Sequence, residues 1–176
     1  SGTLCTPINI VVAGGGLSGV EIAAQMASYA NDFYKNNYFI CNKLNIMIIG
    51  VLNEQNDKRV AIVPKLIAKF KKTLQCDIYV EQGAGVQAFY SDADYTKAGA
   101  SITSKAEVLK NAKVLVSFVP PSDKDLKALP SQAIVISLFA PYMDASVVEH
   151  LKGFDIVPFS MDMIPRSTLA QSMDVL

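Results

Sequence analysis

The chain has 176 residues, of which 51% are hydrophobic and 18% are charged, so it can bury a full core and does not have the composition of a disordered protein. Sixteen basic residues balance sixteen acidic ones, and a chain without a net positive field is not expected to bind nucleic acid or an anionic membrane surface. The cysteines, Cys5, Cys41 and Cys76, are widely spaced and His150 is the only histidine, so we expect reduced thiols and no metal site.

The first half of the chain predicts three strands and two helices. An apolar β-branched run at residues 8–13 leads into a glycine-rich turn, and residues 17–35 keep a helical period. Residues 44–52 form a second buried run. A helix is then expected from Pro64 to about residue 74, because proline suits a first helical turn. Residues 77–81 predict the third strand.

Short helices and strands alternate through the second half. The predicted helices cover residues 92–98, 105–110, 122–126 and 144–151, and the predicted strands cover 114–119, 133–138 and 155–158. The tail after residue 163 is expected to start as a loop and turn helical near its end. Apolar strands alternating with helices indicate an α/β fold, a doubly wound, mainly parallel sheet with helices on both faces, Rossmann-like or flavodoxin-like. We expect one domain over residues 1–176, with ligands at the carboxyl ends of its strands.

The glycine-rich turn near the start has the spacing G-x-G-x-x-G, with Gly14, Gly16 and Gly19 as its glycines. It follows a predicted strand and opens a predicted helix, which is the context of a dinucleotide-binding turn. Gly14 permits the tight turn, Gly16 lets a pyrophosphate approach the backbone, and Gly19 lets helix and strand pack closely. The alternative is a turn retained only as a tightly packed connection.

Residues 8–35, including Val20 and Glu21 directly after the motif, resemble the nucleotide-binding βα unit of flavin-dependent pyridine-nucleotide reductases, especially type II NADH dehydrogenases. The resemblance implies NAD(H) binding, with FAD as a second, less favoured cofactor. It also implies an acidic residue about 20 positions further on that bonds a ribose. Glu54, after the second strand, is the candidate if a long insertion precedes that strand.

From Met47 onward the sequence resembles a different family, the proton-translocating NAD(P) transhydrogenase α subunits and their relatives, the alanine dehydrogenases. The matching segments share consistent spacing to the end of the chain. They are Met47-Ile48-Ile49-Gly50-Val51, Glu54, Lys58-Arg59-Val60-Ala61, Pro64, Glu81-Gln82-Gly83-Ala84-Gly85, Ala98-Gly99-Ala100, Asp162-Met163-Ile164-Pro165-Arg166 and Ala170-Gln171-Ser172-Met173-Asp174.

Three positions separate the two branches of this family. Alanine dehydrogenases hold and protonate their substrate with an arginine, a lysine and a histidine. Arg59 matches the arginine, but Ser117 stands at the lysine position and Phe139-Ala140-Pro141 at the histidine position. A keto-acid site without these groups lacks its general acid, so the resemblance favours a transhydrogenase. The alternative for Arg59 is a surface arginine paired with Asp57 or Glu54.

The tail carries the residues that the transhydrogenase resemblance makes catalytic. Arg166, Gln171 and Asp174 match the three residues of a loop that reaches the bound nicotinamide. Hydride transfer between two nicotinamides depends on holding both rings in a near-attack geometry. Gln171 would bond a carboxamide or ribose, Arg166 a pyrophosphate or ribose oxygen, and Asp174 would orient its neighbours. The alternative is a surface helix opening at Arg166 with the other two side chains solvated.

The resemblance further implies a second nucleotide-binding domain after residue 176 and a family start near Met47. We therefore expect a composite, with a reductase-like βα unit at residues 1–46 joined to a transhydrogenase-like region at 47–176 that is inactive alone. As part of a transhydrogenase, it would position NAD(H) for hydride transfer to NADP, lie in the cytoplasm as a homodimer, and dock on membrane and NADP-binding subunits as a peripheral protein at the inner membrane. The alternatives are a non-catalytic or engineered α/β domain and a fragment of a flavin-dependent NADH dehydrogenase.

Overall fold

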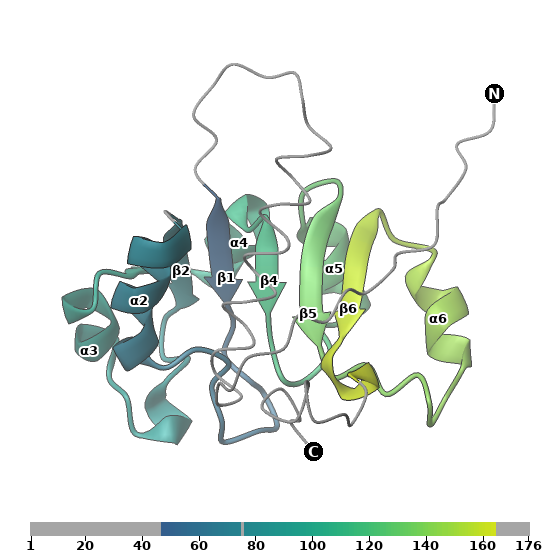
Figure 1. Ribbon diagram of the computed structural model, residues 1–176, viewed down its shortest axis with the longest axis horizontal. Coiled ribbons are helices and arrows are strands. Elements are labelled where there is room, and N and C mark those ends of the chain that lie inside the picture. Colours follow the sequence, from purple (N-terminus) through teal and green to yellow (C-terminus); the bar gives the residue numbers. More distant parts are fainter. Residues whose placement is uncertain (1–46, 75, 165–176) are drawn as a thin grey trace.

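The computed structural model describes residues 47–74 and 76–164, and their strands form one six-stranded parallel sheet. The strands follow one another across it in the order β3-β2-β1-β4-β5-β6 (Figure 1). This is the Rossmann order, in which the winding reverses between β1 and β4. The predicted doubly wound fold is confirmed. Its strands are β1 (Ile48–Val51), β2 (Asp77–Glu81), β3 (Ser101–Thr103), β4 (Val114–Val116), β5 (Ala133–Ser137) and β6 (Ile156–Ser160).

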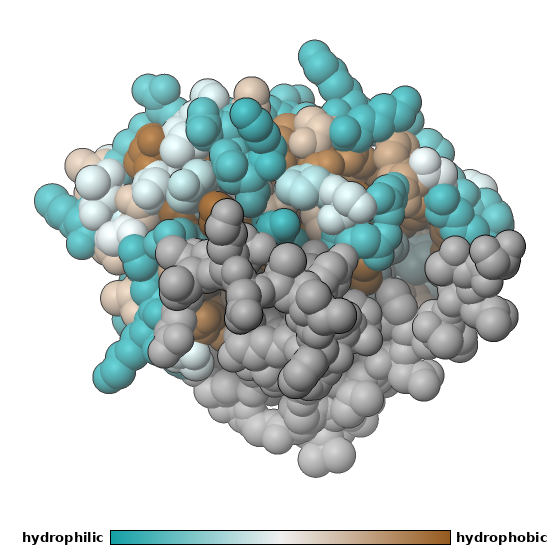
Figure 2. Space-filling model, turned by 90° about the horizontal axis from the view of Figure 1, so that it is seen from above, coloured by the Kyte–Doolittle hydropathy of each residue, from teal (hydrophilic) through white to brown (hydrophobic). Residues whose placement is uncertain are grey.

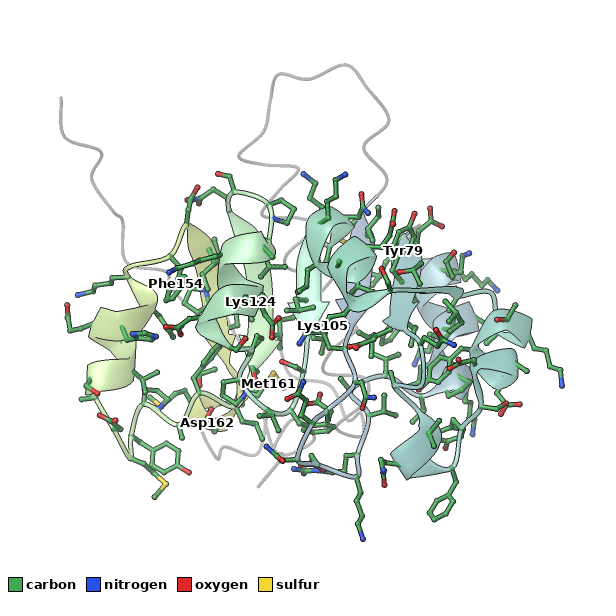
Figure 3. The ribbon with its side chains drawn as sticks, turned by 180° about the vertical axis from the view of Figure 1, so that it is seen from behind. Tyr79, Lys105, Lys124, Phe154, Met161 and Asp162 are labelled. Carbon is green, nitrogen blue, oxygen red and sulfur yellow. The ribbon has the colours of Figure 1, made fainter. Side chains whose placement is uncertain are left out.

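Helices cover both faces of this sheet. In Figure 1, α2 and α3 lie in front of the strands and α4 and α5 behind them, and Figure 3 shows α4 and α5 from the other side. A right-handed crossover between parallel strands produces this alternation. The helices and 3-10 turns are α2 (Pro64–Leu74), η1 (Val86–Ala88), α3 (Asp92–Lys97), α4 (Lys105–Asn111), α5 (Asp123–Ala128), α6 (Ser146–Leu151) and η2 (Met161–Met163).

Each face of the sheet has its own apolar core. Phe70 of α2 and Tyr95 of α3 pack in the first core, and Leu109 of α4 and Leu126 of α5 pack in the second. Successive residues of the central strands alternate between the two, which is why those strands are apolar throughout. Complete burial of a side chain such as Phe70 contributes about 1.5–3 kcal/mol to folding.

Serine caps begin three of the short helices. The side chains of Ser91, Ser104 and Ser122 accept hydrogen bonds from backbone N–H groups in the first turns of α3, α4 and α5. Each cap satisfies a donor that lacks an intrahelical partner. Helix α4 also lies very close to β1, because a Cβ on Gly50 would be 2.8 Å from the Cβ of Ala112.

Most predicted elements in the described residues are confirmed, and two differences concern the sheet around the site. Strand β4 ends at Val116, three residues earlier than predicted, because the following residues bend toward the loop after β1. Strand β3 was not predicted, because it has three residues and carries no fully buried side chain. The predicted strand at 8–13, the helix at 17–35 and the helical tail lie outside the described residues, and the single-domain organisation stays a prediction.

The two ends of the parallel strands, the amino edge and the carboxyl edge of the sheet, differ in the polar side chains that lie there. Seen from above, onto the amino ends of the strands, the described surface is mainly hydrophilic with smaller hydrophobic patches (Figure 2). This is the ordinary mixture of a solvated surface. Three of the four buried polar side chains among the described residues, Glu54, Ser117 and Ser137, instead lie at the carboxyl ends of the strands. The carboxyl edge is therefore the place to look for function.

Candidate functional site

The carboxyl ends of β1 and β4 meet at the point where the strand order reverses. Val51 and Val116 are paired in register, so the residues that follow each strand emerge side by side. In open α/β sheets the crevice at this switch point is the usual ligand site. The groups that occupy it here come from the loops after these two strands.

Glu54 occupies the switch point. Its side chain is 6% exposed, and its carboxylate accepts hydrogen bonds from the backbone N–H of Phe118 at 2.7 Å and of Val119 at 3.0 Å. Burial raises the pKa of Glu54, although the two N–H donors act in the opposite direction. The carboxylate thus ties the loop after β1 to the loop after β4. This geometry favours a structural role, and the ribose contact that we predicted for Glu54 stays a prediction.

Arg59 lies on the other side of the same loop. Its guanidinium bonds both carboxylate oxygens of Asp57, with the shortest N–O distance 2.6 Å, and its central carbon lies 4.2 Å from the ring centroid of Phe118. The arginine lowers the pKa of Asp57 to about 2. The structure therefore brings Glu54 and Arg59 together around Phe118. The Arg59 side chain remains 55% exposed, so the guanidinium can still reach a ligand.

The positions that distinguish alanine dehydrogenases hold no cation. Ser117 lies 3.3 Å from Ser137, hydroxyl to hydroxyl, and Ser137 donates to the carbonyl of Phe118 at 3.2 Å. The backbone N–H of Phe139 donates to the hydroxyl of Ser160. These polar groups satisfy one another within the sheet edge, and neither Ser117 nor Phe139 offers the charged proton donor that a keto-acid site needs.

Asp162 lies where the chain leaves β6 at the carboxyl edge (Figure 3). One carboxylate oxygen accepts from the Ser160 hydroxyl at 2.5 Å, and the other is buried without a hydrogen-bond partner among the described residues. Such a group calls for a donor. The residues of the predicted nicotinamide loop, Arg166, Gln171 and Asp174, follow it directly in sequence. They and the glycines of the first turn, Gly14, Gly16 and Gly19, lie outside the described residues.

A hollow of about 790 Å³ opens beside the switch point, between the loop after β1 and the turn after β2. Figure 1 shows both segments below the lower edge of the sheet. Glu81, the last residue of β2, reaches across and accepts from the backbone N–H of Asn53 at 2.9 Å. Glu81 belongs to one of the matched family segments, but it was not predicted as a site residue. Its position at the end of a strand was the available signal.

Two further properties concern the whole described part of the chain. Within residues 47–74 and 76–164, no group of three or more histidine, cysteine or acidic side chains is arranged to hold a metal ion. None of the helices in this part has the length and apolar character needed to cross a membrane.

The sequence of the described region matches one protein family. Residues 50–176 match the model of the alanine dehydrogenase/PNT N-terminal domain. The chain belongs to this family. It is 30% identical over 132 residues to the NAD(P) transhydrogenase subunit alpha of Haemophilus influenzae, covering 74% of this chain and 25% of that protein. With the NAD(P) transhydrogenase subunit alpha of Cereibacter sphaeroides it is 32% identical over 133 residues, covering 74% and 25%.

Solved structures of this family have the same fold. The transhydrogenase from Sinorhizobium meliloti superposes with a TM-score of 0.67 at 34% identity, covering 73% of this chain and 39% of that one. An L-alanine dehydrogenase superposes with a TM-score of 0.61 at 18% identity, which shows the shared fold alone. The chain thus spans 25% to 39% of these transhydrogenases.

The comparisons support the resemblance that begins at Met47. They give no support to the resemblance of residues 8–35 to type II NADH dehydrogenases, to FAD as a cofactor, or to a composite origin, which remain predictions. The match over residues 50–176 establishes an alanine dehydrogenase/PNT N-terminal domain, and the relatives named as transhydrogenase alpha subunits support the transhydrogenase side of this family.

Proposed function

We propose that this domain acts on the NAD(H) side of an NAD(P) transhydrogenase, where it positions a nicotinamide ring for hydride transfer to NADP. The observation that carries the proposal is the uncharged pair of Ser117 and Ser137 at the sheet edge. Ser117 stands where alanine dehydrogenases need a lysine, so its uncharged side chain favours the transhydrogenase branch of the family. The relatives with that name match the same region of the chain.

In this proposal the described residues form a platform and the tail supplies the contacts. Strand β6 and η2 lead the chain to the ligand edge of the sheet at Ile164. Arg166 then bonds a pyrophosphate or ribose oxygen, Gln171 bonds the nicotinamide carboxamide or ribose, and Asp174 orients the other two. No proton transfer is required of these residues, because hydride transfer between two nicotinamides depends on alignment.

The proposal extends to the working assembly. The full reaction requires the domain that holds most of the NAD(H), together with membrane and NADP-binding subunits. The chain would act in the cytoplasm, bound to the membrane only through those partners, and would be inactive alone. A homodimer is the expected oligomeric state.

NADH fluorescence titration of the purified chain tests the proposal. Substitution Arg166→Ala should raise the Kd about tenfold, because a charge-assisted hydrogen bond is lost, and Gln171→Ala should raise it by about threefold to tenfold. Lys124→Ala is the matched control, since it removes an exposed cation from α5, and should leave the Kd unchanged.

One outcome would contradict the assignment. If NADH binding survives Arg166→Ala but is lost with Gly16→Val, the dinucleotide lies at the glycine turn and the tail has no role. A yellow protein on purification would instead indicate a bound flavin.

A further inference from the structure

The hollow between β1 and β2 has the size of a ligand site. Its volume of about 790 Å³ falls within the roughly 300–1,000 Å³ of small-molecule pockets. We call it the β1–β2 hollow. Its lining is rich in carboxamides and contains one lysine and three carboxylates: Asn53, Glu54, Gln55, Asn56, Asp57, Lys58, Glu81, Gly83, Val86 and Gln87.

Two of the three carboxylates in the hollow are fully engaged elsewhere. Asp57 pairs with Arg59, and both oxygens of Glu54 accept backbone N–H groups. Glu81 uses one oxygen, Oε2, for the N–H of Asn53, and its other oxygen has no hydrogen bond among the described residues. Lys58 forms no ion pair within the same part of the chain. The hollow therefore retains one carboxylate oxygen as a strong acceptor and one ammonium group for a ligand.

The backbone at Gly83 leaves the hollow open. The residue has a φ of +76°, and a Cβ placed on it would meet nothing within 4 Å. Its N–H donates to the Asp92 carboxylate at 2.9 Å, which holds the turn. Beside it, Val86 of η1 exposes 61% of its surface. A ring could lie over this bare turn and against the apolar side chain of Val86.

The place of Glu81 in the sheet identifies the class of ligand. In dinucleotide-binding sheets with this strand order, an acidic side chain after the second strand accepts a hydroxyl of the ribose. Glu81 is the last residue of β2. Carboxamides such as those of Asn56 and Gln87 can donate to and accept from further hydroxyls, and a lysine suits a phosphate.

We propose that the β1–β2 hollow binds a ribonucleotide, with the ribose diol on Glu81 and the 5′-phosphate on Lys58. This site is separate from the nicotinamide contacts of the tail and does not depend on them. A free mononucleotide and the adenosine half of a dinucleotide share this chemistry, so either could supply the ligand.

Calorimetric titration of the full chain with AMP and with 2′-deoxy-AMP tests the diol contact. Wild type should bind AMP about tenfold more tightly than the deoxy analogue, since one hydrogen bond to a charged acceptor is lost. Glu81→Gln should bring the two affinities closer together, because the contact to the diol is no longer assisted by a charge. The glutamine can still accept the N–H of Asn53. Glu107→Gln, an exposed glutamate on α4, should keep the wild-type ratio.

The phosphate contact is tested separately. Lys58→Met should weaken AMP binding about tenfold and leave adenosine binding unchanged, whereas Lys124→Met should alter neither. Equal affinity of wild type for AMP and 2′-deoxy-AMP, or a preference that Glu81→Gln retains, would overturn the proposal. If the Glu81→Gln variant does not fold, Gln87→Ala provides the test instead. It leaves the backbone hydrogen bonds of the turn intact and should weaken AMP binding.

Competition with NADH identifies the source of the ribonucleotide. Displacement of AMP by NADH assigns the hollow to the adenosine half of the dinucleotide, and simultaneous binding assigns it to a free mononucleotide. Both results support the site. Arg166→Ala and Gln171→Ala should leave AMP binding unchanged, so failure of the nicotinamide assignment and failure of this site give different results.

Discussion

Two glutamates stand at neighbouring places on the carboxyl edge and have opposite surroundings. Glu54 follows β1, is 6% exposed, and gives both oxygens to backbone N–H groups of the loop after β4. Glu81 ends β2, is half-buried, and gives one oxygen to the N–H of Asn53. At the ligand edge of a parallel sheet, an acidic residue can thus serve the fold or remain available to a ligand. The hydrogen-bond partners of its two carboxylate oxygens show which of these two roles it has.

The largest expected effect separates these roles directly. Glu54→Ala removes two charge-assisted hydrogen bonds and leaves the N–H groups of Phe118 and Val119 without partners. We expect a loss of about 3 kcal/mol in the free energy of unfolding, measured by urea denaturation. Glu107→Ala on exposed α4 should change it by less than about 0.5 kcal/mol. Equal stability of the two variants would show that Glu54 does not connect the loops.

The sequence predicted that Glu54 follows the second strand, but not its hydrogen bonds to the loop after β4. Local patterns were sufficient for α2, which starts at Pro64, and for β2, whose bounds agree with the prediction. The partners of Glu54 lie 64 and 65 residues further along the chain, and only the strand order brings them to it. Long-range backbone donors leave no sequence motif, so these hydrogen bonds were not predicted, and the ribose contact of Glu54 stays a prediction.

The same dependence on tertiary contacts explains the other differences. Strand β4 ends at Val116, and the backbone N–H groups of Phe118 and Val119 donate to Glu54 in the loop after β1 instead of to a neighbouring strand. The hollow was not predicted, because it forms between two loops whose sequences show no shared pattern. Arg59 was assigned two alternatives from sequence, and the structure shows the ion pair with Asp57.

A smaller effect concerns pH. Glu54→Gln keeps one acceptor but places an amide donor against a backbone N–H, so we expect a loss of about 1–2 kcal/mol at neutral pH. Burial raises the pKa of Glu54 in the folded state, and ionisation therefore costs folded stability. As the pH falls through the folded pKa toward the lower unfolded value, wild type should gain stability relative to Glu54→Gln. Urea denaturation across this range checks the sign. If the difference in the free energy of unfolding between wild type and Glu54→Gln becomes smaller on acidification, the expected sign is wrong.

Substitution of Glu81, at the end of β2, should cost less stability than substitution of Glu54. Glu81→Ala removes one hydrogen bond, to the N–H of Asn53, which water can replace because the site is open. We expect a loss of about 0.5–1 kcal/mol, well below that of Glu54→Ala, while AMP binding falls. Differential scanning calorimetry and the AMP titration measure the two effects on the same protein. A loss as large as that at Glu54 would remove the distinction between the two glutamates.

The smallest change in the free energy of unfolding is expected at the ion pair of Asp57 and Arg59. Its side chains are 20% and 55% exposed, so solvent screens the attraction and Asp57→Asn should cost only about 0.5 kcal/mol. The pairing lowers the pKa of Asp57 from its ordinary 3.8 to about 2. Its contribution is therefore complete above the unfolded pKa and disappears as the pH falls through the folded value.

Denaturation of wild type and Asp57→Asn at neutral pH and near pH 3 measures this contribution. The difference between them should shrink at the lower pH and in 1 M salt. Glu149→Gln provides the control, because the Glu149–Lys152 pair is more exposed, at 74% and 65%, and should contribute nothing measurable. A difference that persists unchanged in high salt would show that Asp57 acts through its hydrogen bond to the backbone N–H of Arg59. Asp57 would then belong with Glu54, as a residue that shapes its loop.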